Sequence, residues 1–234
     1  MRHLKFIAAA LLVLGCTPKD EITCYTDYVD PKIGSGGHGH VFVGANVPFG
    51  MVQLGPTSIP QEWDWCSGYH DSDSTVIGFS HTHLSGTGIG DLFDITVMPV
   101  VGEVTYGRGR EEDPSTGMWS YADRSREVAR PGYYSVPLTR YGITAEMTAT
   151  NRVGLHRYTF PQSEEAGIVI NLMNGGCWDR PMDAQIERVD PMTGQPDPNG
   201  QALRGYRYSR GWADDQKVYF YAEFSKPFKD FKVI

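Results

Sequence analysis

The chain has 234 residues, 40% of them hydrophobic and 21% charged, which is enough for one large soluble domain or two small ones. Its 28 acidic side chains outnumber its 21 basic ones, and the net charge of −7 predicts no nucleic-acid partner and favours a neutral or cationic ligand. The aromatic fraction of 12% argues against disorder, while 27 glycines and 15 prolines interrupt the chain too often for long helices, so an all-β fold is favoured.

The N-terminal segment has the pattern of a secretion signal. Arg2 and Lys5 precede an apolar run over residues 6–14, which is too short to cross a bilayer core of about 30 Å as a helix. The run ends in Val-Leu-Gly-Cys16, which is similar to the bacterial lipobox, where the chain is cleaved before a cysteine that then carries lipid. We therefore predict a lipoprotein signal peptide over residues 1–15, a lipidated Cys16 and a polar tether over residues 16–27. The alternative is an ordinary signal with a buried cysteine.

This signal predicts an exported protein that is held in the bacterial cell envelope by a lipid anchor. The membrane is then a partner of the lipidated end, and the domain lies in the periplasm or on the outer-membrane surface.

From Tyr28 onward, runs rich in β-branched and aromatic residues recur every ten to fifteen residues, with turn residues between them. The expected strands cover residues 50–54, 75–79, 94–101, 133–138, 143–150, 153–160, 167–172 and 217–224. Residues 190–200 are dense in Pro, Gly, Asn and Asp and predict a long exposed loop before residues 202–208. No window of eleven or more residues has a 3.6-residue apolar period, so the pattern predicts a β-sandwich or barrel over residues 28–234.

Five of the seven histidines fall within residues 38–83, and four of them form two His-x-His motifs, His38/His40 and His81/His83. In an extended segment this spacing puts both rings on one side, where paired imidazoles can chelate a transition metal. Histidines beside glycines can also hold loops through hydrogen bonds or stack on a ligand. Because no conventional zinc spacing is present, the sequence assigns no metal ligand.

Residues 62–70 hold two tryptophans, a tyrosine, an aspartate and a histidine. Sugars present apolar C–H faces and rings of hydroxyls, so an aromatic ring beside Asp64 and His70 suits a saccharide, although aromatic clusters also occur in cores. Glycine-rich segments over residues 33–40 and 84–90 allow the backbone to approach a ligand closely. No Walker loop and no Gly-x-Ser-x-Gly elbow occurs, which disfavours nucleotide binding and serine hydrolysis.

Six ordered motifs resemble the N-terminal domain of glycoside hydrolase family 92, the calcium-dependent exo-acting α-mannosidases of bacteria. They are Tyr28-Val-Asp-Pro-Lys-Ile-Gly-Ser-Gly-Gly-His-Gly-His40, Gly44-Ala-Asn-Val-Pro-Phe-Gly-Met-Val-Gln-Leu54, Trp63 with Cys66-Ser-Gly-Tyr-His70, Gly78-Phe-Ser-His-Thr-His-Leu-Ser-Gly-Thr-Gly88, Pro131-Gly-Tyr-Tyr134 and Gly154-Leu-His-Arg-Tyr-Thr-Phe160.

The resemblance implies an all-β, mutarotase-like β-sandwich (supersandwich) over residues 28–234, followed in complete members by an (α/α)6 barrel domain that this chain lacks. The catalytic acid and base and most of the calcium coordination lie in that barrel, so the resemblance implies no catalytic residue and no metal ligand in this chain. Apolar residues continue to Val233 and Ile234, which predicts a chain cut before its last strands, with an open sheet edge.

The resemblance also implies a mannose-containing glycan as the partner of the sandwich loops. Trp63 is similar to the aromatic wall of the family's leaving-group subsite, and the weaker candidates for the same pocket are Asp64, His70, His38, His40 and His83. Trp65 departs from the small residue expected there. We predict that this chain alone does not hydrolyse mannosides; the alternatives are a free-standing carbohydrate-binding lipoprotein and a His-rich metalloenzyme.

Overall fold

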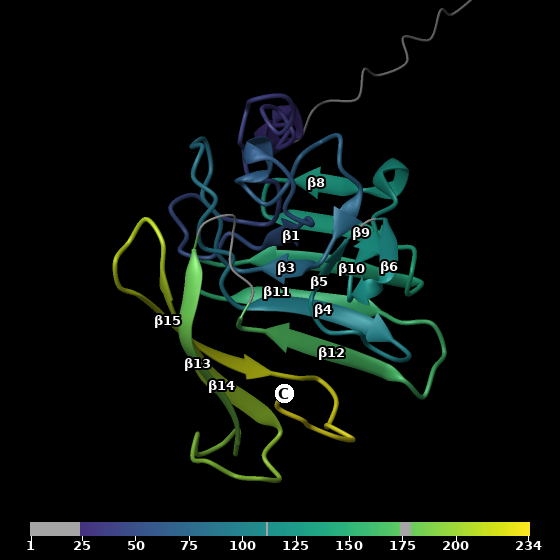
Figure 1. Cartoon of the computed structure of the whole chain (residues 1–234), viewed down its shortest axis with the longest axis vertical. Coiled ribbons are helices and arrows are strands. Elements are labelled where there is room, and N and C mark those ends of the chain that lie inside the picture. Colours follow the sequence, from purple (N-terminus) through teal and green to yellow (C-terminus); the bar gives the residue numbers. More distant parts are fainter. Residues whose placement is uncertain (1–23, 111, 174–178) are drawn as a thin grey trace, which may run out of the picture.

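The computed structural model describes residues 24–110, 112–173 and 179–234 (Figure 1). The predicted signal peptide, Cys16 and most of the tether lie outside these residues. Within the described ranges there is no α-helix, and the helical segments are three short 3-10 turns: η1 (Tyr25–Tyr28), η2 (Trp63–Trp65) and η3 (Arg124–Arg126). No helix in the same ranges is long and apolar enough to cross a membrane. The predicted all-β character is confirmed.

Two four-stranded antiparallel sheets form the body of the domain. One has the order β1-β3-β4-β12 and the other the order β11-β10-β9-β8. Their bounds are β1 (Gly55–Thr57), β3 (Gly78–Ser80), β4 (Thr96–Val101), β12 (Ala166–Asn171), β8 (Val128–Arg130), β9 (Tyr133–Leu138), β10 (Ile143–Ala149) and β11 (Gly154–Thr159). Phe79 and Met98 of the first sheet share the main hydrophobic core with Val136 and Met147 of the second, which makes the pair a sandwich.

Strand β10 shows why these residues build a sandwich. Ile143, Ala145 and Met147 are buried, whereas Thr144 and Glu146 between them are partly exposed. Successive side chains of a strand point to opposite faces, so this alternation turns one face toward the core and the other toward solvent. Truncating Met147 to alanine would cost about 2–5 kcal/mol of stability, because the core cannot close over the lost volume.

A third antiparallel sheet contains β13 (Arg180–Val189), β14 (Ala202–Arg210) and β15 (Gln216–Glu223), in that order. Figure 1 places it beneath β12. Arg207 of β14 is fully buried and donates to Asp94 at 2.5 Å and to Asp179 at 2.5 Å. Its Nε also donates to the Leu172 carbonyl at 2.9 Å. Because Asp94 comes just before β4, this one guanidinium joins the third sheet to the first.

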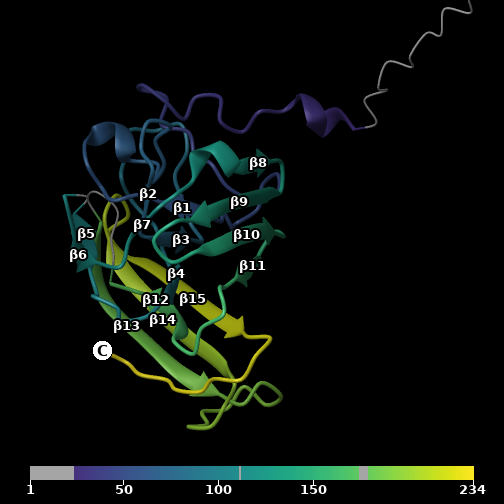
Figure 2. The same ribbon diagram turned by 90° about the vertical axis from the view of Figure 1, so that its right-hand side faces the viewer.

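Two short ribbons complete the strands, β2 (Thr75–Val76) with β7 (Ser120–Tyr121) and β5 (Arg108–Arg110) with β6 (Asp113–Gly117). None of the sheets formed by the described residues closes into a barrel. Figures 1 and 2 show η2 and the loops around it at the upper end of the sandwich, on the same side as the N-terminal segment.

Five expected strands coincide with observed ones to within one residue at each end: β9, β10, β11, β12 and β15. The expected run over residues 75–79 is divided into β2 and β3, because Gly78 has a φ of 152° that interrupts a regular strand. The run over residues 50–54 is mostly irregular, and the strand begins at Gly55 instead. Residues 190–200 form the expected connection between β13 and β14.

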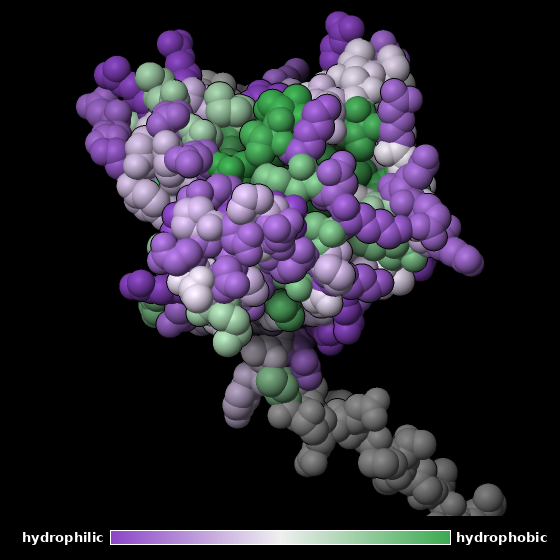
Figure 3. Space-filling view, turned by 90° about the horizontal axis from the view of Figure 1, so that it is seen from below, coloured by the Kyte–Doolittle hydropathy of each residue, from purple (hydrophilic) through white to green (hydrophobic). Residues whose placement is uncertain are grey.

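The underside of the domain carries apolar groups in its centre, bordered by polar ones (Figure 3). The exposed large apolar side chains include that of Ile168 on β12 and, at the end of the chain, those of Val233 and Ile234. Strands β12 and β15 each lie at the edge of a sheet. Open strand edges beside apolar surface favour association with another chain segment.

Candidate functional site

The exposed indole of Trp63 is the centre of the candidate site. It lies on η2, is 53% exposed, and donates from Nε1 to the Gly88 carbonyl at 2.7 Å. A Cβ on Gly88 would lie 2.2 Å from Cζ2 of this indole, so the loop must carry glycine there to let the ring lie flat against its backbone. The ring is therefore both open to solvent and held in place.

Asp64, the next residue, gathers the first His-x-His motif. Its Oδ1 accepts hydrogen bonds from His38 Nδ1 and His40 Nε2, each at 2.8 Å. The hydrogen bond that His38 donates to Asp64 raises the pKa of His38, and the bonds from His38 and His40 lower the pKa of Asp64. The His40 ring also meets Trp63 edge-on, with centroids 4.4 Å apart. These contacts bring Trp63, Asp64, His38 and His40 into one cluster.

Backbone geometry explains why both histidines reach the same carboxylate. A Cβ on Gly39 would lie 1.9 Å from the Gly34 carbonyl oxygen, so only glycine fits between them. His40 has a φ of 56°, a left-handed conformation that costs energy for a residue other than glycine. The His40 carbonyl in turn accepts from the Gly86 amide at 2.8 Å, which ties the loops over residues 33–40 and 84–90 together.

His70 lies behind this cluster and supports its loop. The ring stacks on Trp65 with centroids 4.3 Å apart, donates from Nε2 to the Gly37 carbonyl at 3.1 Å, and accepts at Nδ1 from the Ser72 hydroxyl at 2.7 Å. Trp65 donates to Asp73 at 2.6 Å. Trp65 therefore packs on His70 and orients its ring, and both ring nitrogens of His70 have hydrogen-bond partners within the protein.

His83 is buried in the core, away from the Trp63 cluster. It donates from Nδ1 to the Gln53 carbonyl at 2.8 Å and stacks on Phe42 at 4.7 Å. Burial lowers its pKa to about 4, so the ring is neutral at physiological pH. The other ring of that motif, His81, contacts His156 instead, at 3.1 Å between Nε2 atoms. The second His-x-His motif therefore does not present a pair.

The remaining aspartates of this region each have a structural partner. Asp71 pairs with Lys32, Asp73 with Trp65, and Asp94 with Arg207. Asp91 accepts from the backbone amides of Leu92 and Trp212, each at 2.7 Å. Within the described ranges no group of three or more His, Cys, Asp or Glu side chains is arranged to hold a metal ion.

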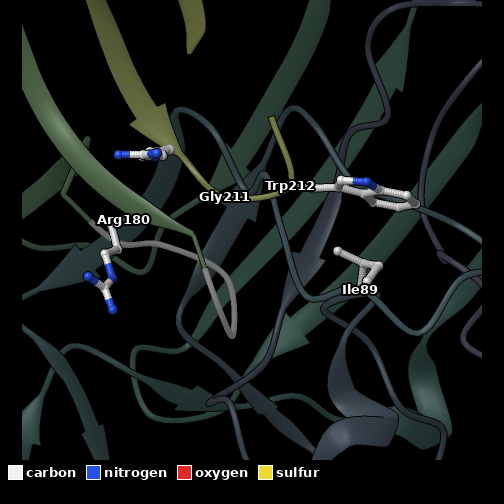
Figure 4. Close-up of a pocket in the computed structure, with 5 residues that line it drawn as sticks. Ile89, Arg180, Gly211 and Trp212 are labelled. Atoms are coloured by element: carbon white, nitrogen blue, oxygen red, sulfur yellow. The ribbon is translucent and has the colours of Figure 1, made fainter. Parts of the chain in front are cut away.

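Sequence reasoning missed a hollow on the other side of the loop over residues 84–90. A cavity of about 410 Å³ is lined by Ile89, Arg180, Arg210, Gly211 and Trp212. Figure 4 shows the Trp212 indole close above Ile89, with Arg180 on the far side. A Cβ on Gly211 would lie 2.6 Å from the Asp91 carboxylate, so glycine lets this loop close onto Asp91. Only the fold brings β13, β14 and this loop together.

An exposed, fixed tryptophan beside a carboxylate and two imidazoles can cover an apolar face of a ligand while it hydrogen-bonds the ligand's polar groups. Residues 28–234 match the model of the glycosyl hydrolase family 92 N-terminal domain, and the chain belongs to this family. The resemblance noted in the sequence is confirmed.

Solved members of the family share the fold. The family GH92 α-mannosidase BT3965 from Bacteroides thetaiotaomicron, in complex with mannoimidazole, is 39% identical with a TM-score of 0.80, over 87% of this chain and 26% of that one. The GH92 glycosyl hydrolase ccman5 has a TM-score of 0.65 at 23% identity, over 85% of this chain and 26% of that one, which shows a common fold alone.

A curated relative extends the comparison to a second organism. An uncharacterized secreted glycosidase from Arthroderma benhamiae is 32% identical over 142 residues, which is 58% of this chain and 17% of that protein. The chain therefore spans about a quarter or less of the length of these relatives.

Proposed function

We propose that this chain is the N-terminal, sugar-contacting part of an inverting exo-α-mannosidase that acts on α-linked mannosides such as those of N-glycans. In this proposal Trp63 forms the apolar wall of the leaving-group subsite, and Asp64, His38 and His40 provide polar edges to the same pocket. His70 and His83 act from behind, by holding the loop and core on which the pocket rests.

The observation that carries the proposal is the half-exposed Trp63 ring, fixed by the Gly88 carbonyl and by the edge of His40. The ring is held by two contacts yet stays about half open to solvent, so a ligand that covers it gains apolar burial with little loss of side-chain entropy. Sugar C–H faces stack on such a ring, while Asp64 and His38 remain available at its edge for hydroxyl groups.

Hydrolysis is assigned to parts of the longer relatives that this chain does not span. Inversion needs two carboxyl groups about 6.5–9.5 Å apart, one protonated and one ionised. Asp71 pairs with Lys32, Asp73 with Trp65, Asp91 with backbone amides and Asp94 with Arg207. Carboxylates bound in this way suit a structural role and not proton transfer to a substrate. We assign calcium to the same unspanned parts, and propose that this chain alone is inactive.

Calorimetric titration of the purified chain with methyl α-mannoside tests the binding role. We expect Trp63→Ala to weaken binding about tenfold, a loss of about 1.4 kcal/mol in line with a stacking contact. Trp212→Ala is the matched control, since Trp212 is also exposed and lies outside the cluster. Equal effects of the two variants would contradict the proposal. Release of mannose from an α-1,2-linked mannobiose by the chain with calcium present would contradict its inactivity.

We also propose export and lipid anchoring through Cys16, from the Val-Leu-Gly-Cys16 pattern and the secreted relative. Labelling of expressing cells with radioactive palmitate should mark the wild-type protein and leave Cys16→Ser unmarked. Label on Cys16→Ser would contradict lipidation at this position. Fractionation of the membranes would then separate a periplasmic from a surface location.

A further inference from the structure

The outward face of the third sheet carries a group of tyrosines that the Trp63 site does not use. Tyr206 and Tyr208 lie on β14, and Tyr219 and Tyr221 lie on β15, with Tyr206 and Tyr219 directly opposite in the register. Tyr219 is 65% and Tyr221 47% exposed. Leu203, Arg207 and Ser209 on the other face of β14 are buried, whereas Tyr206 and Tyr208 are only partly buried, so the tyrosines do not belong to the core.

The rings are held in fixed positions by one another. Tyr206 and Tyr208 stack with centroids 4.4 Å apart, and the hydroxyls of Tyr208 and Tyr219 are 2.8 Å apart. The Tyr206 hydroxyl donates to Asp183 at 3.0 Å. The hydrogen bond with Tyr219 raises the pKa of Tyr208 to about 12, so these hydroxyls stay neutral and can both donate and accept. A rigid aromatic surface loses little conformational entropy when a ligand covers it.

A hollow of about 230 Å³ lies among these side chains. It is lined by Gln185, Glu187, Arg204, Gly205, Tyr206, Tyr219 and Phe220. Its size is below that of pockets for drug-sized molecules and suits one monosaccharide unit. A Cβ on Gly205 would lie 2.2 Å from the Gln185 carbonyl oxygen, so glycine is needed for the strands to approach here.

The polar groups around the hollow match a ligand rich in hydroxyls. Arg204 Nε donates to Glu187 at 2.8 Å and its Nη1 donates to the Gly194 carbonyl at 3.0 Å, which fixes the guanidinium beside the hollow. A fixed guanidinium and carboxylate can bond adjacent hydroxyls of one sugar, and the Gln185 amide can add a donor and an acceptor.

Charge around the hollow favours an uncharged ligand. The two charged side chains that line the hollow, Glu187 and Arg204, pair with each other, so the lining carries no net charge. The combination of fixed aromatic rings, neutral hydroxyls and a balanced ion pair is the chemistry that recognises a neutral sugar.

We propose that the outward face of β13, β14 and β15 is a second carbohydrate-binding surface, which takes a neutral hexose unit of a glycan independently of the Trp63 cluster. Two sugar-binding surfaces on one domain hold a branched or repeating glycan more tightly than either surface alone. The inference does not depend on the proposed role of Trp63.

Affinity electrophoresis of the chain in gels that contain soluble α-mannan tests this surface. We expect Tyr219→Ala to weaken retention about threefold to tenfold, while Tyr219→Phe keeps the ring and most of the retention. Tyr106→Ala is the control, since Tyr106 is similarly exposed and lies outside this sheet. Circular dichroism and size-exclusion chromatography confirm that each variant is folded and has the wild-type oligomeric state.

The outcomes separate this inference from the proposed function. Retention that falls in Tyr219→Ala, whatever Trp63→Ala does, supports the second surface. Retention that depends on Trp63 alone overturns the inference and leaves the proposed function standing. The inference is also overturned if the wild-type chain is not retained in α-mannan, β-glucan or xylan gels. A change of oligomeric state in Tyr219→Ala overturns it as well, because it would mark the tyrosines as a protein interface.

Discussion

Replacing Arg207 with methionine tests how the third sheet is attached. The guanidinium is fully buried and is shared by Asp94 and Asp179, each at 2.5 Å. Methionine is unbranched like the arginine stem but shorter and uncharged, so the change leaves two buried carboxylates without their common cation. Breaking a buried ion pair by removing one partner costs about 3–5 kcal/mol, whereas an exposed pair contributes about 0–1 kcal/mol.

The carboxylates keep part of their hydrogen bonding in this variant. Asp94 Oδ2 still accepts from Thr82 at 2.7 Å and from Gln216 at 2.8 Å. We therefore expect a loss of about 3–5 kcal/mol and no more, which is a large share of the 5–15 kcal/mol that stabilises a typical domain.

Urea denaturation followed by circular dichroism measures this loss. Arg204→Met on the same strand is the matched control, because Arg204 and Glu187 form a partly exposed pair whose removal should cost about 1 kcal/mol or less. A cost for Arg207→Met no larger than that for Arg204→Met would refute the reasoning. A triple variant with Asp94→Asn and Asp179→Asn should recover stability, since it removes the unpaired charges.

Three further changes test the site and the core. Gly88→Ala places a Cβ 2.2 Å from the Trp63 ring, so the ring must move and calorimetry should show mannoside affinity falling as in Trp63→Ala. Gly167→Ala is the control and should bind as wild type, because its Cβ meets Val100 at an ordinary 3.6 Å. Burial lowers the pKa of His83 from 6.5 to about 4, so the unfolded chain binds the proton more readily than the folded one. The contribution of His83 should therefore lower the free energy of unfolding by about 3 kcal/mol as the pH drops from 6.5 to 4. A His83→Gln variant whose stability falls with the same pH slope would contradict this. Asp64→Asn should lower the pKa of His38, followed by NMR of its ring protons, because the hydrogen bond that raises it loses its charged acceptor; an unchanged pKa would count against the observed pairing.

The strands that sequence reasoning located are those whose side chains alternate or form an apolar block. Strand β9 coincides with its expected range because Tyr134, Val136 and Leu138 supply the core face. Strand β13, the longest strand of the described residues, is not among the expected ones, although Met182, Ala184 and Ile186 alternate with Asp183, Gln185 and Glu187 along it. This alternation is a local signal that would have located the strand, and its pairing with β14 over nine positions fixes its register.

Contacts between segments far apart in the sequence could not be predicted from local patterns. Arg207 and Asp94 are separated by 113 positions, and Trp212 reaches Asp91 across 121. The sequence contains no periodicity that connects such residues. By contrast, Trp63, Asp64 and the histidines at 38 and 40 could be predicted as candidates, because their residue types already suit a sugar and glycines surround them.

The two His-x-His motifs show how one intervening residue decides what such a pair does. Gly39 has no side chain and packs against the Gly34 carbonyl, so the chain folds back there and both rings meet Asp64. Thr82, the residue between His81 and His83, instead donates from its hydroxyl to Asp94 at 2.7 Å, two residues after β3 ends at Ser80. His81 contacts Ile95 and His156, while His83 contacts Gln53 in the core. The same spacing thus gives a cluster on one carboxylate where glycine lets the chain fold back, and different contacts for each ring where the Thr82 hydroxyl binds Asp94.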